Sequence, residues 1–135
     1  MEVLLLKRFI FKTLNIPRLQ DLIRVKESEL DDNKLYCFLC GNAITSTSER
    51  ISVDGAHEHS FTNPHGYSFH IGCFRNALGC IQVGIVTDDF SWFKGYSWRY
   101  ALCADCQQHL GWIYDSQDQF YGLILDRLIS TSEFN

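Results

Sequence analysis

Several features that would place this 135-residue sequence in a broad class are scarce or missing. Lys and Arg number 12 against 16 Asp and Glu, and no stretch concentrates the basic residues. A surface that follows a phosphate backbone needs such a stretch, so we expect no nucleic-acid partner. No apolar run reaches about 18 residues, so the sequence predicts no membrane-spanning helix and no membrane partner.

The first eleven residues are largely apolar, but they lack the pattern of a signal peptide. They begin with an acid, Glu2, and Lys7-Arg8 interrupts the apolar run. A signal peptide carries its positive charge first and then about 7–15 unbroken apolar residues. The sequence therefore predicts a cytoplasmic location.

Composition divides the chain into a short extension and one domain of ordinary size. Residues 1–34 contain no Gly, Cys or Trp, and Pro17 is followed by leucines at helical spacing. We expect 1–34 to be a partly helical N-terminal extension, 35–130 to form a single domain, and 131–135 to be a tail.

The six cysteines include two Cys-x-x-Cys pairs, Cys37–Cys40 and Cys103–Cys106. Two such pairs can hold one metal ion through four thiolates, and this arrangement favours structural zinc. Disulfide or redox pairs are the alternative interpretation. The other two cysteines, Cys73 and Cys80, stand in apolar sequence, and the default prediction for them is buried, inert thiols.

From Tyr36 onward, short runs of β-branched and aromatic residues alternate with turn residues. These runs predict a mainly antiparallel β fold. The predicted strands span 51–53, 67–71, 81–86, 98–102, 111–114 and 120–125, and a short end piece spans 126–129.

All three tryptophans fall between Ser91 and Tyr114, beside the second cysteine pair. Three indoles so close together suit either a hydrophobic core or an aromatic pocket, and the residues alone leave these two interpretations level. His57 and His59 lack partners at metal-ligand spacing, so no second metal site is expected. His109 follows the second cysteine pair, but four thiolates already complete a zinc site, so we expect His109 to support the ligands from outside or to have a structural role.

Four motifs occur in an order that resembles a known family. They are Asn63-Pro-His-Gly-Tyr67, the Ser-Trp-Phe-x-Gly-Tyr-x-Trp pattern of 91–98, Cys103-x-x-Cys106 and His109-x-Gly-Trp112. In this order they resemble the CULT domain, the thalidomide-binding domain family of cereblon. The similarity covers about 36–130, and the sequence looks like a single-domain member.

The resemblance implies a β-tent of two antiparallel sheets set at a steep angle and pinned by structural zinc. It also implies a pocket of three tryptophans, with Tyr114 at its base, a covering loop and a rim. The implied zinc ligands are Cys37, Cys40, Cys103 and Cys106, and the implied ligand-binding residues are Asn63, Pro64, Phe90, Ser91, Trp92, Trp98, Trp112 and Tyr114.

The implied function is non-catalytic binding of cyclic imides such as glutarimide and thalidomide-type drugs, of uracil-like rings, or of protein C-termini that carry a cyclic imide. Two positions depart from the family pattern: Lys94 stands where Pro is frequent, and Phe90 replaces a His of cereblon. No complete adaptor-binding region of a ubiquitin-ligase receptor is expected in this chain.

Two other functions remain open from the sequence. One is an aromatic cage for methylated ammonium groups, with Asp88, Asp89 and Asp115 as the counter-charge. The other is an enzyme similar to methionine sulfoxide reductase B, which would need a reactive thiol from Cys73 or Cys80. Neither cysteine lies in the sequence setting of that enzyme family, and no nucleophile–base pair is apparent near the tryptophans.

Overall fold

The computed structural model describes residues 33–131. The helix predicted near Pro17 and the tail at 132–135 lie outside the described residues. Within them, nine strands and two short 3₁₀ helices follow one another. The strands are β1 Lys34–Cys37, β2 Ala43–Ser46, β3 Glu58–Thr62, β4 Ser68–Phe74, β5 Cys80–Thr87, β6 Ser97–Cys103, β7 His109–Asp115, β8 Gln119–Ile124 and β9 Leu128–Ser130; the 3₁₀ helices are η1 Thr47–Glu49 and η2 Leu125–Arg127.

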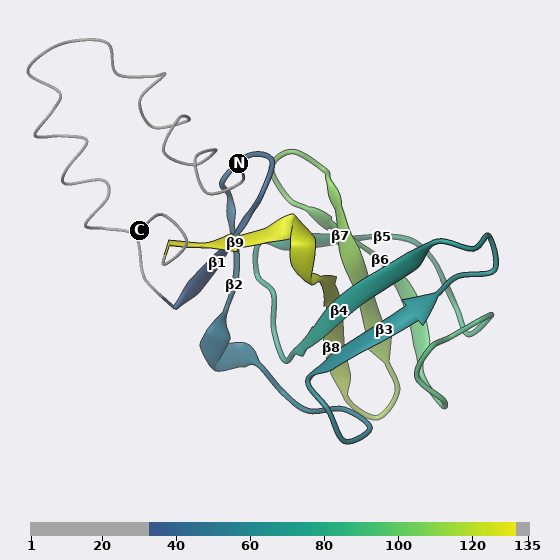
Figure 1. Ribbon diagram of the computed structural model, residues 1–135. Helices are drawn as coiled ribbons and strands as arrows, with labels where there is room; N and C mark the ends of the chain where they lie inside the picture. Colours follow the sequence, from purple (N-terminus) through teal and green to yellow (C-terminus); the bar gives the residue numbers. More distant parts are fainter. Residues whose placement is uncertain (1–32, 132–135) are drawn as a thin grey trace, which may run out of the picture.

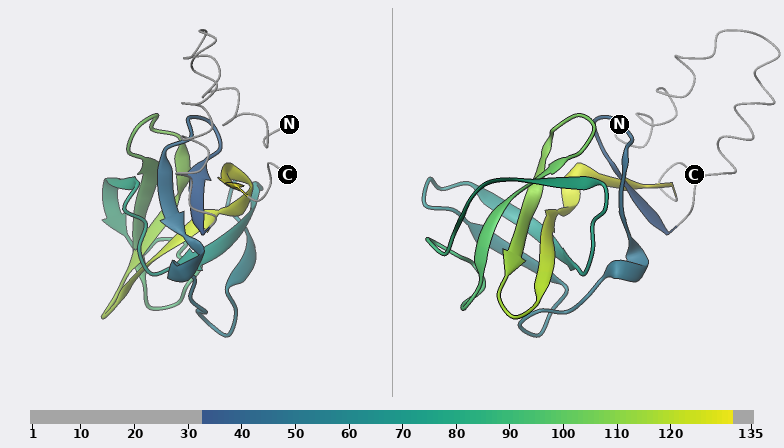
Figure 2. Two further views of the ribbon diagram at one scale, coloured as in Figure 1. Left: turned by 90° about the vertical axis from the view of Figure 1, so that its left-hand side faces the viewer. Right: turned by 180° about the vertical axis from the view of Figure 1, so that it is seen from behind.

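The strands form two antiparallel sheets, which confirms the predicted fold class. The smaller sheet has the order β2-β1-β9, and the larger has the order β3-β4-β8-β7-β6-β5. Figure 1 shows the smaller sheet at one end of the molecule, while the larger sheet bends so that β3 and β4 lie in front of β5 and β6. The view from behind in Figure 2 shows the same bend with β5 nearest the viewer. Residues of the β3–β4 turn and of β6 and β7 line a common hollow.

The core consists of two clusters. One packs Leu35 and Ile44 of the smaller sheet against Phe74 and Leu110 of the larger, beside buried Cys37 and Cys103. The other fills the bend of the larger sheet with Ile71, Cys73, Phe93, Trp112, Tyr114, Phe120 and Ile124. The first cluster joins the two sheets, and the second supports the floor of the space between β4 and β7.

A close approach between β7 and β8 depends on one glycine. A Cβ on Gly111 would lie 2.0 Å from the carbonyl oxygen of Gly122. No side chain fits at such a distance, so only glycine can stand here. The glycine of the His109-x-Gly-Trp112 motif thereby keeps the two strands together where Trp112 leaves β7.

The strand predicted at 51–53 is wrong. Val53 forms only an isolated bridge with Ala56. Asp54 has a φ of 51° and Gly55 a φ of 89°, so the chain turns back at once and no ladder can extend. Four of the other predicted strands are present as the longer strands β4, β5, β6 and β7, and the strand predicted at 120–125 is β8, of the same length but one residue earlier. By contrast, β1, β2 and β3 were not predicted as strands.

Candidate functional site: a four-cysteine centre beside an aromatic hollow

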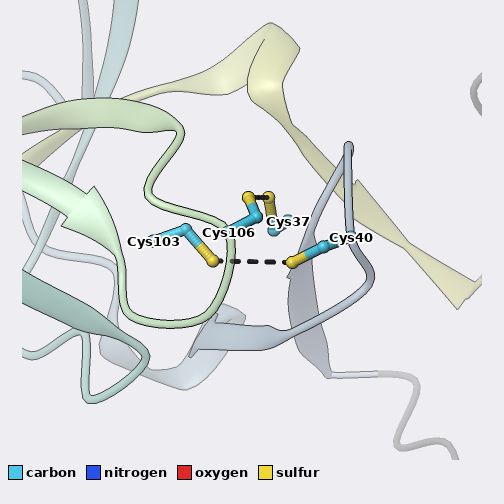
Figure 3. A group of neighbouring side chains, drawn as sticks. All are labelled: Cys37, Cys40, Cys103 and Cys106. Carbon is cyan, nitrogen blue, oxygen red and sulfur yellow. Dashed lines mark hydrogen bonds between the residues drawn. The ribbon is translucent and has the colours of Figure 1, made fainter.

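The four cysteines of the two Cys-x-x-Cys pairs come together although they lie far apart in the sequence. All four sulfurs lie within 4.8 Å of one another. Cys37 Sγ is 3.6 Å from Cys106 Sγ, and Cys40 Sγ is 3.6 Å from Cys103 Sγ. In Figure 3 the four side chains point inward from the turn after β1 and the turn after β6. A zinc ion bound by four thiolates at about 2.3 Å has sulfur–sulfur distances of about 3.8 Å, so the four cysteines lie within metal-binding distance of one another and the spacing of the cluster is compatible with zinc.

The two turns that carry these cysteines repeat the same backbone pattern. Gly41 N–H donates to the Cys37 carbonyl at 2.8 Å, and Gln107 N–H donates to the Cys103 carbonyl at 2.9 Å. Both residues after the second cysteine have positive φ, 80° at Gly41 and 66° at Gln107. In each turn the left-handed residue reverses the backbone after the second cysteine, so that both thiols of the pair face the centre of the four-sulfur cluster.

Local donors also favour negative charge on the sulfurs. Asn42 N–H points at Cys40 Sγ at 3.4 Å, and its side-chain amide points at Cys103 Sγ at 3.6 Å. Burial opposes ionisation of Cys103, but the backbone N–H groups of Cys106 and Asp105 outweigh it and lower its pKa to about 7. Burial raises the pKa of Cys37 to about 11. A single thiolate is therefore readily formed, while further thiolates need a cation beside them.

The second feature is a hollow of about 580 Å³ between the β3–β4 turn and the face of β6 and β7. This volume falls in the usual range for small-ligand sites. Its walls are mostly aromatic. The residues that line it are Asn63, Pro64, His65, Phe69, Phe90, Trp92, Trp98, Tyr100, His109, Trp112 and Tyr114.

One wall of the hollow is an aromatic patch that strand register creates. Trp98 lies opposite Tyr114, and Tyr100 lies opposite Trp112, across β6 and β7. Residues two apart on a strand share a face, so all four rings project to the same side of the sheet. Tyr100 and Phe69, which the sequence analysis did not assign to a site, are therefore part of the lining.

The loop between β5 and β6 brings Trp92 to the hollow, in contact with this patch. The Trp92 ring stacks on Phe61 at 4.9 Å and 12°, and meets Trp112 edge-to-face at 4.9 Å and 76°. Phe93 is 1% exposed and anchors this loop in the core. The Ser91 hydroxyl donates to the Phe93 carbonyl at 3.0 Å, and Ser91 lies outside the lining of the hollow.

The third indole is fixed by a hydrogen bond. Trp98 Nε1 donates to the Asp89 carbonyl at 2.9 Å. Phe90, the next residue, has a φ of 57° and is 75% exposed at the mouth of the hollow. Left-handed backbone is costly for a residue with a β-carbon, and such strain is often stored at binding sites. The left-handed backbone at Phe90 turns the chain from the Asp89 carbonyl, which binds Trp98, towards Trp92.

The β3–β4 turn forms a pre-built cover over one side. Asn63 Oδ1 accepts hydrogen bonds from the backbone N–H groups of His65 and Tyr67, at 3.0 and 2.9 Å. The side-chain carbonyl of Asn63 is thus occupied by the turn itself, and Pro64 stiffens the next position. Together these contacts hold the cover in one shape.

His109 lies in the wall of the hollow, where the sequence analysis had expected only a supporting or structural role. Its Nε2 is 2.9 Å from the Gly111 carbonyl, so this nitrogen carries the hydrogen and donates. Its ring meets Trp112 edge-to-face at 4.9 Å and 87°. Burial lowers the pKa of His109, and the nearby Arg127 adds to this effect.

The groups required by the alternative functions lie elsewhere. Asp88, Asp89 and Asp115 do not line the hollow, so they do not supply the counter-charge expected for an ammonium cage. Burial raises the pKa of both Cys73 and Cys80 to about 12. Thiols that resist ionisation in this way are poor nucleophiles.

Comparisons with known proteins find relatives of part of this chain. No profile of a known protein family matches the chain. Protein cereblon of Drosophila melanogaster is 30% identical over 94 residues, which cover 65% of this chain and 16% of the relative. Protein cereblon of Drosophila pseudoobscura pseudoobscura is 30% identical over 105 residues, 69% of this chain and 17% of the relative. Protein cereblon of Gallus gallus is 32% identical over 104 residues, 70% of this chain and 23% of the relative.

The two antiparallel sheets and the four-cysteine centre define a small metal-site β domain. With the similarity to cereblon from insects and a bird, the described residues are a cereblon-like CULT domain. The chain spans only about a sixth to a quarter of the length of these relatives. None of the helices in the described part of the chain is long and apolar enough to cross a membrane.

Proposed function

We propose that this domain, 35–130, is a non-catalytic module that binds cyclic imides or uracil-like rings, with the four cysteines holding structural zinc. The observation that carries the proposal is the aromatic hollow, in which Trp92 and Trp112 meet at 76° while a hydrogen bond fixes Trp98. A flat or slightly puckered ring of five or six atoms suits such a box, because each indole offers it an apolar face. The resemblance to the CULT family supports the same ligand class.

The polar edge of such a ring needs an acceptor for its N–H and donors for its two carbonyls. Two groups near the mouth are already occupied, because Ser91 N–H donates to the Asp88 carbonyl at 3.3 Å and Trp98 Nε1 donates to Asp89. We therefore assign the acceptor to the Phe90 carbonyl. The donors are the Trp92 backbone N–H and the indole N–H of Trp92 or Trp112. An imide edge left without these partners would lose about 1–3 kcal/mol for each unmet group.

Zinc has a mechanical role in this proposal. When bound, it supplies a charge that keeps all four thiolates ionised. The Cys103–Cys106 turn then joins β6, which carries Trp98, to β7, which carries Trp112. The residues of the two turns hold the ion, and the fixed turn keeps those two indoles at their separation.

The proposed ligands are a free small ring, a uridine-like nucleoside, or a protein C-terminus that ends in a cyclic imide. The methylated-ammonium alternative lacks its carboxylates in the hollow, and the reductase alternative lacks an ionisable free thiol. We therefore propose neither of these functions. A location in the cytoplasm is in keeping with reduced cysteines, which disulfide-forming compartments would oxidise.

The test is a titration of tryptophan fluorescence, since all three tryptophans line the hollow. Thalidomide, uridine and trimethyllysine are added separately to the zinc-loaded protein. We expect saturable changes with thalidomide or uridine and none with trimethyllysine. Trp112→Phe should weaken the response at least tenfold while zinc content stays at one ion per chain. Tyr121→Phe, outside the hollow, is the matched control and should bind like the parent. A response to trimethyllysine alone would refute the proposal.

A further inference from the structure

The floor of the hollow contains a tyrosine whose ring cannot move. Tyr114 is 2% exposed. Its ring packs edge-to-face on Phe93 at 4.8 Å and 77° and stacks on Phe120 at 5.1 Å and 20°. On another side, a Cβ on Gly122 would lie 3.0 Å from Tyr114 Cε2, so the backbone of β8 comes close to the ring. Because the ring is packed on three sides, the position of the Tyr114 hydroxyl is fixed.

The Tyr114 hydroxyl is without a hydrogen-bond partner, yet it is not sealed off. Within residues 33–131, the one sealed side-chain nitrogen or oxygen that lacks a partner is Nε of Arg99. The Tyr114 hydroxyl makes no hydrogen bond there either, so it must retain part of the small accessible surface of this residue. Tyr114 lines the aromatic hollow. We therefore take its accessible surface to face that space.

This hydroxyl remains a hydrogen-bond donor at all ordinary pH values. Burial raises the pKa of Tyr114 far above its usual range, and the nearby Cys73 thiol adds to the effect. A ligand that fills the hollow removes water from the hydroxyl. If the atom that arrives there is a methylene, the donor is left unpaired in a dry site, and this weakens binding. If the atom is an acceptor, the donor is satisfied.

We infer that the Tyr114 hydroxyl is a specificity determinant that favours rings with a hydrogen-bond acceptor on the edge opposite the imide N–H. This inference rests on the proposed function, because it takes the imide edge to bind near Phe90 and Trp92 at the mouth. The class of ligand becomes narrower: a six-membered imide with a ring oxygen or a carbonyl at its far edge, rather than an all-methylene ring such as glutarimide.

The experiment compares two rings of nearly the same shape. Glutarimide has a methylene opposite its imide nitrogen, and morpholine-3,5-dione has an oxygen there. Both are titrated into zinc-loaded parent protein and into Tyr114→Phe, with tryptophan fluorescence as the readout. We expect the parent to prefer morpholine-3,5-dione by about 3- to 10-fold, the effect of one buried hydrogen bond. Tyr114→Phe should abolish or reverse that preference without weakening glutarimide binding.

A matched control comes from a tyrosine outside the hollow. Tyr121 of β8 does not line the hollow. Tyr121→Phe should leave the ratio of the two affinities unchanged. If Tyr114→Phe loses affinity for both rings equally, or keeps the parent's ratio of the two affinities, the inference is overturned while the proposed function still stands. If neither ring, nor thalidomide or uridine, binds the parent, the proposed function fails and this inference with it. Should Tyr114→Phe not fold, a parent that prefers glutarimide would still overturn the inference.

Discussion

The side chain of Arg127 reaches from η2 to the wall of the hollow, where its Nη1 donates a 2.7 Å hydrogen bond to the carbonyl of His109. Its guanidinium also lies 5.9 Å from the centre of the Phe69 ring. The Arg127 carbonyl accepts from Phe38 N–H at 3.0 Å, inside the first cysteine turn. Arg127 therefore contacts both the first cysteine turn and two residues that line the hollow.

Replacing Arg127 should loosen the hollow. In Arg127→Met the His109 carbonyl loses a charged donor and Phe69 loses the cation above it, so we expect a loss of about 1–2 kcal/mol in the free energy of unfolding. Imide affinity should fall as well, while zinc content stays unchanged. The measurements are urea denaturation and the fluorescence titration. Arg50→Met, at an exposed arginine without a side-chain hydrogen bond in the described residues, is the control and should match the parent. Identical behaviour of the two variants would contradict this role.

Loss of a metal ligand should unfold the domain. In Cys106→Ser the centre keeps three thiolates, and zinc binding supplies much of the stability of such small sites. We expect loss of stoichiometric zinc and of the cooperative thermal transition, and the same result for the parent treated with a strong chelator. Cys80→Ala removes a thiol outside the four-sulfur cluster and should retain one zinc ion per chain. A native melting curve for metal-free protein would show that the cluster has no structural role.

The two cysteine turns offer a paired test of backbone strain. Gln107 has a φ of 66°, whereas Gly41 occupies the equivalent place in the other turn with a φ of 80°. Gln107→Gly should therefore raise stability by about 0.5–1 kcal/mol, because the relief of left-handed strain exceeds the entropy cost of glycine. Gly41→Ala should lower it by about 1 kcal/mol for the opposite reason. Thermal melts at constant zinc concentration measure both changes in stability. If the two variants change stability in the same direction, the strain explanation is excluded.

Acidification should destabilise the protein in part through His109. Burial lowers the pKa of His109 in the folded state. Between that lowered value and the ordinary value of about 6.5, the unfolded chain binds more protons than the folded one, so stability falls as pH falls through this window. His109→Gln should flatten this part of the profile by up to about 1.4 kcal/mol per pH unit. Zinc content must be followed at each pH, since protonated thiols release the ion. Parallel profiles for parent and variant would rule out a contribution from His109.

Much of the fold and of the site geometry follows from local sequence. Cys-x-x-Cys spacing is enough to pair thiols on a turn, and the four predicted sulfurs do lie together. The sequence predicted strands at 98–102 and 111–114, and the alternation of side chains along β6 places Tyr100 on the same face as Trp98. The strand β3 was not predicted, because Glu58, His59 and Ser60 do not form a run of β-branched or aromatic residues.

Other features depend on contacts that no local pattern encodes. Phe69 and His65 line the hollow from β4 and the β3–β4 turn. His109 is three residues before Trp112, and it shares the face of Trp112 because the β6–β7 ladder is irregular between Ala101 and Leu102. The hydrogen bond from Trp98 to Asp89 joins a strand to a loop nine residues earlier. Ser91 was predicted at the rim, but its hydroxyl is turned into its own loop.

The cysteine pairs have a consequence for folding. Cys40 and Cys103 are 63 positions apart in the chain, and a metal ion bound by both closes the loop between them. In the chain-entropy treatment of cross-links, closing a loop of this length disfavours the unfolded state by about 4 kcal/mol. A bound ion would thus be a reversible cross-link between two distant parts of the domain. A chain without the bound ion would lack this constraint, so the turn between β6 and β7, and with it the separation of Trp98 and Trp112, would form less readily.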